Sequence, residues 1–118
     1  MGVSFLKLLV LRTPEPDRLR RFYEHLGIDF AEECHGTGPP HFAGRVGDAV
    51  LELYPLSNRG VAVDSTLRLG FSVTDLSEAI QSLKADGVSI VSGPKTTPWG
   101  NCAVVRDPDG RSVELYEE

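Results

Sequence analysis

Two glutamates in similar surroundings are the residues of this sequence best suited to acid–base or metal chemistry. Glu52 lies in AVLELY (49–54) and Glu114 lies in SVELY (112–116). In a strand, apolar neighbours on either side of a residue face the core, and the residue itself faces the opposite side. Two carboxylates that face one cleft are able to act as a general acid and base, or to bind a metal ion. The alternative is a structural role, in which Arg68 or Arg45 neutralises the two glutamates as ion pairs.

Other polar and aromatic side chains are expected on the same faces as the glutamates. His41 shares a face with Glu52 and could supply a nitrogen ligand to a metal, although a solvated histidine at a strand start is the alternative. Trp99 offers an aromatic wall to a flat or cationic ligand, or else packs at the sheet edge. The predicted ligand-binding residues are Arg68, Trp99, Asn101, Tyr54, Arg45 and His41. The remaining histidines, His25 and His35, are expected on the surface.

The first half of the chain has the pattern strand, helix and three strands. An apolar run over 5–11 predicts a strand, and apolar residues at helical spacing from Leu19 to Leu26 predict a helix ended by Gly27. A second strand is expected over 28–33. A hairpin follows, with strands 41–46 and 49–54 around the turn Gly47-Asp48. Its predicted register pairs Val46 with Ala49 and Ala43 with Glu52, so that His41, Arg45, Glu52 and Tyr54 share one face.

The second half repeats this order about 60 residues later in the chain. A strand over 66–73 precedes a helix that Asp75 caps, with Glu78 three residues on, and Gly87 ends this helix. A short strand is expected over 88–91. The last hairpin turns at Asp107-Pro108-Asp109-Gly110. Its predicted register pairs Arg106 with Arg111, Ala103 with Glu114 and Asn101 with Tyr116. Cys102, Val104, Val113 and Leu115 are then expected to face the helix.

The predicted fold class is therefore α+β, with two tandem βαβββ units forming a curved mixed sheet around a cleft. We expect one domain, 1–118, made of units 4–54 and 66–117 joined by a linker at 55–65. Pockets with a few convergent polar groups are typical of such clefts.

Composition restricts the classes of partner. The 118 residues carry 12 Lys and Arg against 17 Asp and Glu, a formal charge of −5, which argues against a nucleic-acid partner. No apolar run approaches the roughly 20 residues of a membrane helix, and the first residues lack the features of a signal peptide. A cytoplasmic protein without a membrane partner is predicted. Cys34 and Cys102 match neither a disulfide framework nor a zinc-binding spacing.

Four sequence segments together resemble the vicinal oxygen chelate superfamily, which contains glyoxalase I, bleomycin-resistance proteins and dioxygenases. They are RFYEHLG (21–27), AVLELY (49–54), PWG (98–100) and DPDGRSVEL (107–115). The resemblance covers essentially the whole chain and implies the fold described above. It also implies that two chains often associate, so that a homodimer is expected. The superfamily spans many chemistries, and the resemblance therefore does not identify a reaction.

In metal-dependent members of the superfamily, each half supplies one ligand from its first strand and a glutamate from its last. The glutamate positions correspond to Glu52 and Glu114. The first-strand positions fall on Leu8 (or Lys7, if the register shifts by one) and on Arg68. Leucine has no donor atom, and cationic side chains repel a divalent metal. Two of the four usual ligands are missing, so the cofactor is unknown, although His41 could add a nitrogen.

Two functions from different classes remain open at this point. The first is a lyase or isomerase similar to lactoylglutathione lyase, in which Glu114 moves a proton while a metal or Arg68 stabilises negative charge. The second is a non-catalytic protein that sequesters a drug or metabolite, as the bleomycin-resistance members do. An acidic cleft with Tyr54 and Trp99 suits a cationic aromatic ligand.

Overall fold

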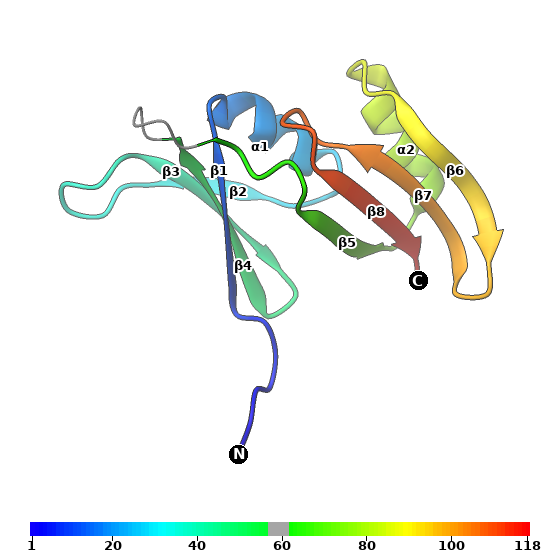
Figure 1. Ribbon diagram of the computed structural model, residues 1–118, viewed down its shortest axis with the longest axis horizontal. Coiled ribbons are helices and arrows are strands. Elements are labelled where there is room, and N and C mark those ends of the chain that lie inside the picture. The colour runs from blue at the N-terminus through cyan, green and yellow to red at the C-terminus, as the bar shows by residue number, and fades with distance from the viewer. Residues whose placement is uncertain (57–61) are drawn as a thin grey trace. The chain divides into compact units, whose positions relative to one another are not determined.

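The computed structural model describes residues 1–56 and 62–118, which form two compact units, Met1–Val63 and Asp64–Glu118 (Figure 1). Part of the predicted linker, residues 57–61, lies outside the described residues. Each unit has the element order strand, helix and three strands, so the predicted tandem βαβββ architecture is confirmed. Whether the two units enclose a common cleft stays a prediction.

The first unit contains one helix and a four-stranded mixed sheet. Its elements are β1 (Leu8–Thr13), α1 (Pro16–Glu24), β2 (Phe30–Glu33), β3 (His41–Val46) and β4 (Ala49–Pro55). The strand order is β1-β4-β3-β2, in which β1 runs parallel to β4 and the other pairs are antiparallel. Helix α1 contacts β1, β3 and β4, and therefore covers one face of this sheet.

Helix α1 begins at Pro16 and ends at Glu24, two residues before the Leu26 to which the apolar spacing extends. Pro16 occupies its first turn, where the missing N–H costs no hydrogen bond. Gly27 follows the helix with φ +93°, a conformation that other residues rarely adopt. The apolar face of the helix is buried together with β1 and β4; the residues concerned are Leu11, Leu19, Phe22, Tyr23, Leu51 and Leu53. The opposite face of the sheet is therefore left uncovered by the helix.

The predicted register of the first hairpin is confirmed. Val46 pairs with Ala49, and Ala43 pairs with Glu52. Since side chains alternate along a strand, Glu52 lies on the face opposite to the buried Leu51 and Leu53. We call this uncovered side the helix-free face of the first unit.

The second unit repeats the arrangement. Its elements are β5 (Arg68–Val73), α2 (Leu76–Ala85), β6 (Ile90–Thr97), β7 (Gly100–Arg106) and β8 (Ser112–Glu117). The strand order is β5-β8-β7-β6, and Figure 1 shows α2 against one side of this sheet. Asp75 caps α2 as predicted, because its carboxylate accepts the N–H of Glu78 at 3.0 Å. Among the described residues, the helices are all too short to cross a membrane.

The predicted register of the second hairpin is wrong by one residue. Arg106 pairs with Ser112, and Val104, not Ala103, pairs with Glu114. Cys102 pairs with Tyr116 in place of Asn101. As a consequence Ala103 and Val105 face the core and are fully buried, whereas Cys102 and Val104 lie on the side of Glu114.

The physical reason for this shift lies in the turn, which has five residues because Arg111 belongs to it. The N–H of Asp107 donates to the carbonyl of Arg111, and the N–H of Arg111 donates to the Asp107 carboxylate, both at 3.0 Å. The Arg111 guanidinium then folds back onto the carboxylates of Asp107 and Asp109, each 3.1 Å away. This ion cluster is buried, and it closes the turn.

Candidate functional site

A row of four side chains crosses the helix-free face of the first unit, one from each strand. Arg12 on β1 pairs with Tyr54 on β4, and Glu33 on β2 pairs with His41 on β3. The rings of His41 and Tyr54 stack with centroids 4.1 Å apart and an interplanar angle of 10°. The Arg12 guanidinium carbon lies 5.3 Å from the centroid of the Tyr54 ring. The row therefore joins a cation, two stacked rings and a carboxylate.

His41 is the most buried member of this row, with 2% of its surface exposed. Its Nδ1 lies 3.2 Å from the carbonyl oxygen of Pro39, which orients the ring. Its Nε2 lies 3.6 Å from the carboxylates of both Glu33 and Glu52. Within the described residues this Nε2 has no hydrogen-bond partner. The prediction that His41 and Glu52 lie together is confirmed by these distances.

A hollow of about 520 Å³ lies next to this row on the first unit. Small side chains leave this space, because Ala31 and Ala43 face each other across β2 and β3. Its lining residues are Gly27, Asp29, Phe30, Ala31, Glu33, Ala43, Gly44, Arg45 and Val50. The volume falls within the range of small-molecule pockets in proteins.

In the second unit, Glu114 is held by two neighbours. The Tyr116 hydroxyl donates to Glu114 Oε1 at 2.5 Å. The Arg68 guanidinium donates to Oε2 through Nε at 3.0 Å and also through Nη2. The Tyr116 hydrogen bond, followed by that from Arg68, holds the pKa of Glu114 below its ordinary value of 4.5. The same contacts raise the pKa of Tyr116 and of Arg68.

This arrangement limits what Glu114 can do chemically. A carboxylate with a lowered pKa is a weak base, and at neutral pH it carries no proton to donate. Both of its oxygens already accept hydrogen bonds. Arg68, to which the resemblance assigns the first-strand ligand position of this half, forms an ion pair with Glu114, and this pair corresponds to the structural alternative that the sequence left open.

The low pKa of Glu114 predicts a pH-dependent contribution to stability. Because folding lowers this pKa below 4.5, the ionised carboxylate stabilises the folded state at neutral pH. The stabilisation is lost as the pH falls through the folded-state pKa. We expect the free energy of unfolding of the wild type to fall more steeply below about pH 4.5 than that of Glu114→Gln. Urea unfolding at a series of pH values measures this difference.

Two further variants test the cause of the shift. Tyr116→Phe and Arg68→Met each remove one donor to Glu114, and each should make the acid limb of the stability curve shallower than in the wild type. Parallel curves for the wild type and Glu114→Gln would contradict the assignment.

Other predicted site residues lie apart from the glutamates. Asn101 lies on the side of the sheet that α2 covers, where it donates to Glu117 at 3.2 Å and accepts from Thr96 at 2.9 Å. Its expected place beside Glu114 is therefore wrong, as a result of the one-residue shift of β7. Trp99 lies in the turn between β6 and β7 and is 80% exposed, so it does not pack as core at the sheet edge. Leu8, at the start of β1, is one of the two residues to which the resemblance assigns the first-strand ligand of the other half, and it offers no donor atom; the alternative, Lys7, precedes the strand.

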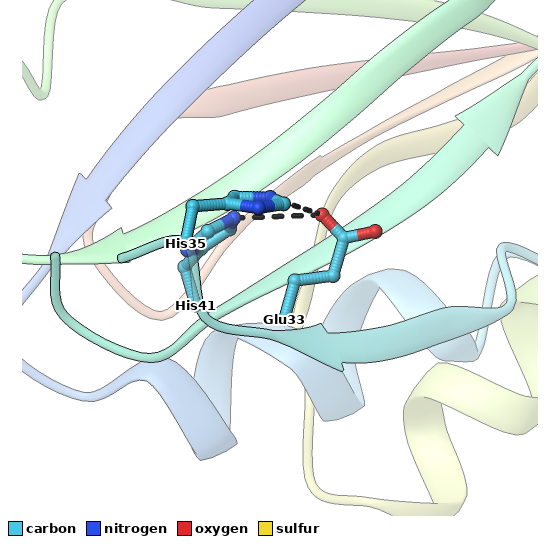
Figure 2. Close-up of side chains that lie close together, drawn as sticks. All are labelled: Glu33, His35 and His41. Atoms are coloured by element: carbon cyan, nitrogen blue, oxygen red, sulfur yellow. Dashed lines mark hydrogen bonds and ion pairs between the residues drawn. The ribbon is translucent and has the colours of Figure 1, made fainter. Parts of the chain in front are cut away.

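Two residues near the site were not predicted to belong to it: Glu33 was not considered, and His35 was expected only on the surface, where it does lie. Glu33 lies on the edge strand β2, and His35 lies in the segment that follows it. With His41 they form a group whose potential ligand atoms all lie within 4.8 Å of one another (Figure 2). In Figure 2 both imidazole rings approach the same carboxylate oxygen of Glu33. No motif in the sequence predicts this group, because its residues become neighbours only through the pairing of β2 with β3.

Fold and sequence together define the class of protein. The model of the Glyoxalase/Bleomycin resistance protein/Dioxygenase superfamily matches residues 6–115, and the chain belongs to this superfamily. The resemblance inferred from the sequence is thereby confirmed. Among curated proteins, no significant match was found.

Several solved structures are similar to the chain over nearly its whole length. TnmS3, an antibiotic-binding protein from Streptomyces sp. CB03234, is 26% identical with a TM-score of 0.77, covering 99% of this chain and 98% of its own. An integron cassette protein from the mobile metagenome of Vibrio cholerae is 30% identical with a TM-score of 0.77, covering 99% and 97%. Lactoylglutathione lyase from Agrobacterium tumefaciens is 19% identical with a TM-score of 0.69, covering 99% and 96%, a likeness of fold alone.

Proposed function

We propose that this protein binds a small organic molecule without transforming it, in the hollow on the helix-free face of the first unit. The hollow itself is the observation that carries the proposal. It combines a floor of small side chains, Ala31 and Ala43, with charged groups at its border. An apolar floor with a few polar groups is typical of ligand sites.

The state of Glu114 favours binding over catalysis. A lyase or isomerase of the glyoxalase type needs a carboxylate that takes a metal or moves a proton. Glu114 is instead paired with Arg68 and Tyr116, and Leu8 offers no ligand in the other half. A binding protein requires Glu114 neither to hold a metal nor to move a proton.

The charges around the hollow favour a ligand that carries positive charge. Two carboxylates, Asp29 and Glu33, border it against the one guanidinium of Arg45. A third carboxylate, that of Glu52, lies near that of Glu33, because each of them is 3.6 Å from Nε2 of His41. The similar structure TnmS3 is described as an antibiotic-binding protein, which supports a drug-like ligand class for this chain too.

A titration with a planar aromatic cation tests this function. We expect isothermal titration calorimetry to give saturable binding of one phenanthridinium dye per chain, with weaker binding of a neutral analogue of the same size. Chromatography of the recovered dye should show it unchanged after long incubation. Equal affinity for the neutral analogue would contradict the charge preference, and a chemically altered dye would contradict a purely binding function.

The association of two chains remains part of this proposal. Supporting it, the first residues expose several large apolar side chains, namely Met1, Val3, Phe5, Leu6 and Leu8. Such side chains commonly mark a surface that another chain covers. Light scattering of the purified protein distinguishes a dimer from a monomer. The cytoplasmic location stays a prediction from the sequence.

A further inference from the structure

The buried imidazole of His41 lies close to two carboxylate groups. The carbonyl of Pro39 can only accept a hydrogen bond, so the contact at 3.2 Å requires a proton on Nδ1. In the neutral ring, Nε2 then carries a bare lone pair. The carboxylates of Glu33 and Glu52 each lie 3.6 Å from this Nε2. A buried nitrogen beside two carboxylates requires a positive charge between them, which either a second ring proton or a bound metal ion supplies.

Within this group His35 Nε2 is hydrogen-bonded to Glu33 at 3.2 Å, whereas the distance from His41 Nε2 to the same carboxylate fits a shared cation better than a hydrogen bond. A hydrogen bond from nitrogen to oxygen spans about 2.7–3.2 Å, so 3.6 Å is too long for one. In a tetrahedral zinc site, bonds of about 2.0–2.2 Å place two ligand atoms roughly 3.3–3.6 Å apart. The Nε2 atoms of His35 and His41 lie 3.2 Å and 3.6 Å from the same Oε1 of Glu33. The 3.6 Å separation matches an edge of such a tetrahedron, and the 3.2 Å separation is slightly shorter than one.

From this geometry we propose that Glu33, His35 and His41 bind a divalent transition-metal ion of the zinc class. The ligands come from β2, the segment after it and the start of β3, all within the first unit (Figure 2). Imidazole and carboxylate together suit zinc, and three protein ligands leave one position for water or another group. The hydrogen bond between Nδ1 and Pro39 is the outer contact that typically orients a metal-binding histidine.

The charges of the group are also balanced by such an ion. Two neutral imidazoles leave the carboxylates of Glu33 and Glu52 as the negative groups, and a divalent cation neutralises both. His35 is exposed and Glu33 is half-buried, which gives a hydrated ion a path to the buried nitrogen of His41. This site does not use Glu114 or the first-strand positions. Because the ion would neutralise Glu33 and Glu52, two of the carboxylates that favour a cationic organic ligand, the dye titration described above is made on metal-free protein.

A zinc titration of the untagged protein, before any organic ligand is added, tests the proposal. All variants carry Cys34→Ser, because the thiol of Cys34 is exposed next to the site and is itself able to bind zinc. We expect one Zn²⁺ per chain by calorimetry. We also expect affinity to fall at least about tenfold in His35→Ala and in Glu33→Gln, each of which removes one ligand. Replacing zinc with Co²⁺ should give a visible ligand-field spectrum that both variants lose.

A matched histidine variant and a stacking variant complete the test. His25→Asn removes a histidine outside the group and should leave zinc affinity unchanged. His41→Phe keeps a ring against Tyr54 but no nitrogen, so it should fold and lose zinc binding. The proposal is overturned if no stoichiometric zinc binds, if Cys34→Ser alone abolishes binding, or if the ligand variants bind as the wild type does. Since the dye titration uses metal-free protein, its outcome and that of the zinc titration are separable.

Discussion

Replacing Arg111 with methionine is expected to lower the free energy of unfolding of the protein by about 3–5 kcal/mol. The guanidinium is 2% exposed and lies 3.1 Å from the carboxylates of both Asp107 and Asp109. Methionine fills much of the same volume but leaves two buried carboxylates without their cation. Because small domains have only about 5–15 kcal/mol of stability in total, the loss should be plain in urea unfolding.

Arg106→Met is the matched control for this variant. Arg106 belongs to the same hairpin, but it is exposed and contacts the carbonyl of Gly110 at the long distance of 3.4 Å. We expect its loss to change stability by less than about 0.5 kcal/mol. Should Arg111→Met fail to fold, Asp109→Asn removes one charge of the cluster and gives a smaller loss. Equal stabilities of the Arg111 and Arg106 variants would show that the buried cluster does not hold the turn.

Filling the hollow of the first unit should abolish ligand binding while leaving the fold intact. Ala43 lies at its floor, next to Ala31 and Glu52 on the neighbouring strands. In Ala43→Phe the ring occupies the space that we assign to the ligand, and aromatic residues are well tolerated in strands. We expect the affinity for the aromatic cation to fall at least about tenfold, which corresponds to about 1.4 kcal/mol. Calorimetric titration measures it.

Ala43→Ser is the control for this variant, because it changes the polarity of the floor but hardly its volume. It should bind the dye within a few-fold of the wild type. Circular dichroism and urea unfolding of Ala43→Phe establish that the sheet is retained. Unchanged affinity in a folded Ala43→Phe protein would place the ligand elsewhere.

The first hairpin was predicted in full, and the reason is local. Its turn has two residues, Gly47 and Asp48, and Gly47 adopts φ +58°, which suits a tight turn. A turn of fixed length determines the register of the strands it joins. The face that carries His41 and Glu52 could therefore be deduced from the sequence.

The second hairpin shows why the same reasoning fails elsewhere. A turn is predicted at Asp107-Pro108-Asp109-Gly110, but the neighbouring sequence does not show that the next residue, Arg111, also belongs to the turn. The preceding strand does not reveal the correct register, because residues 102–105 are apolar on both faces. Alternation of hydrophobic and polar residues therefore could not select between the two registers.

The candidate metal group could not be predicted from sequence patterns, for a further reason. Glu33 and His41 become neighbours through the pairing of β2 with β3, whose connection spans residues 34–40. A connection of that length does not fix a register, in contrast to a two-residue turn. His35 therefore looked like an ordinary surface histidine, and Glu33 like one of many acidic residues.

Amide chemical shifts during a dye titration test most directly whether the helix-free face of the first unit binds the ligand. We expect the largest shift changes at Ala31, Ala43, Arg45 and Val50, and little change at the same positions in Ala43→Phe. Changes confined to residues 64–118, around Arg68 and Glu114, would contradict binding at this face.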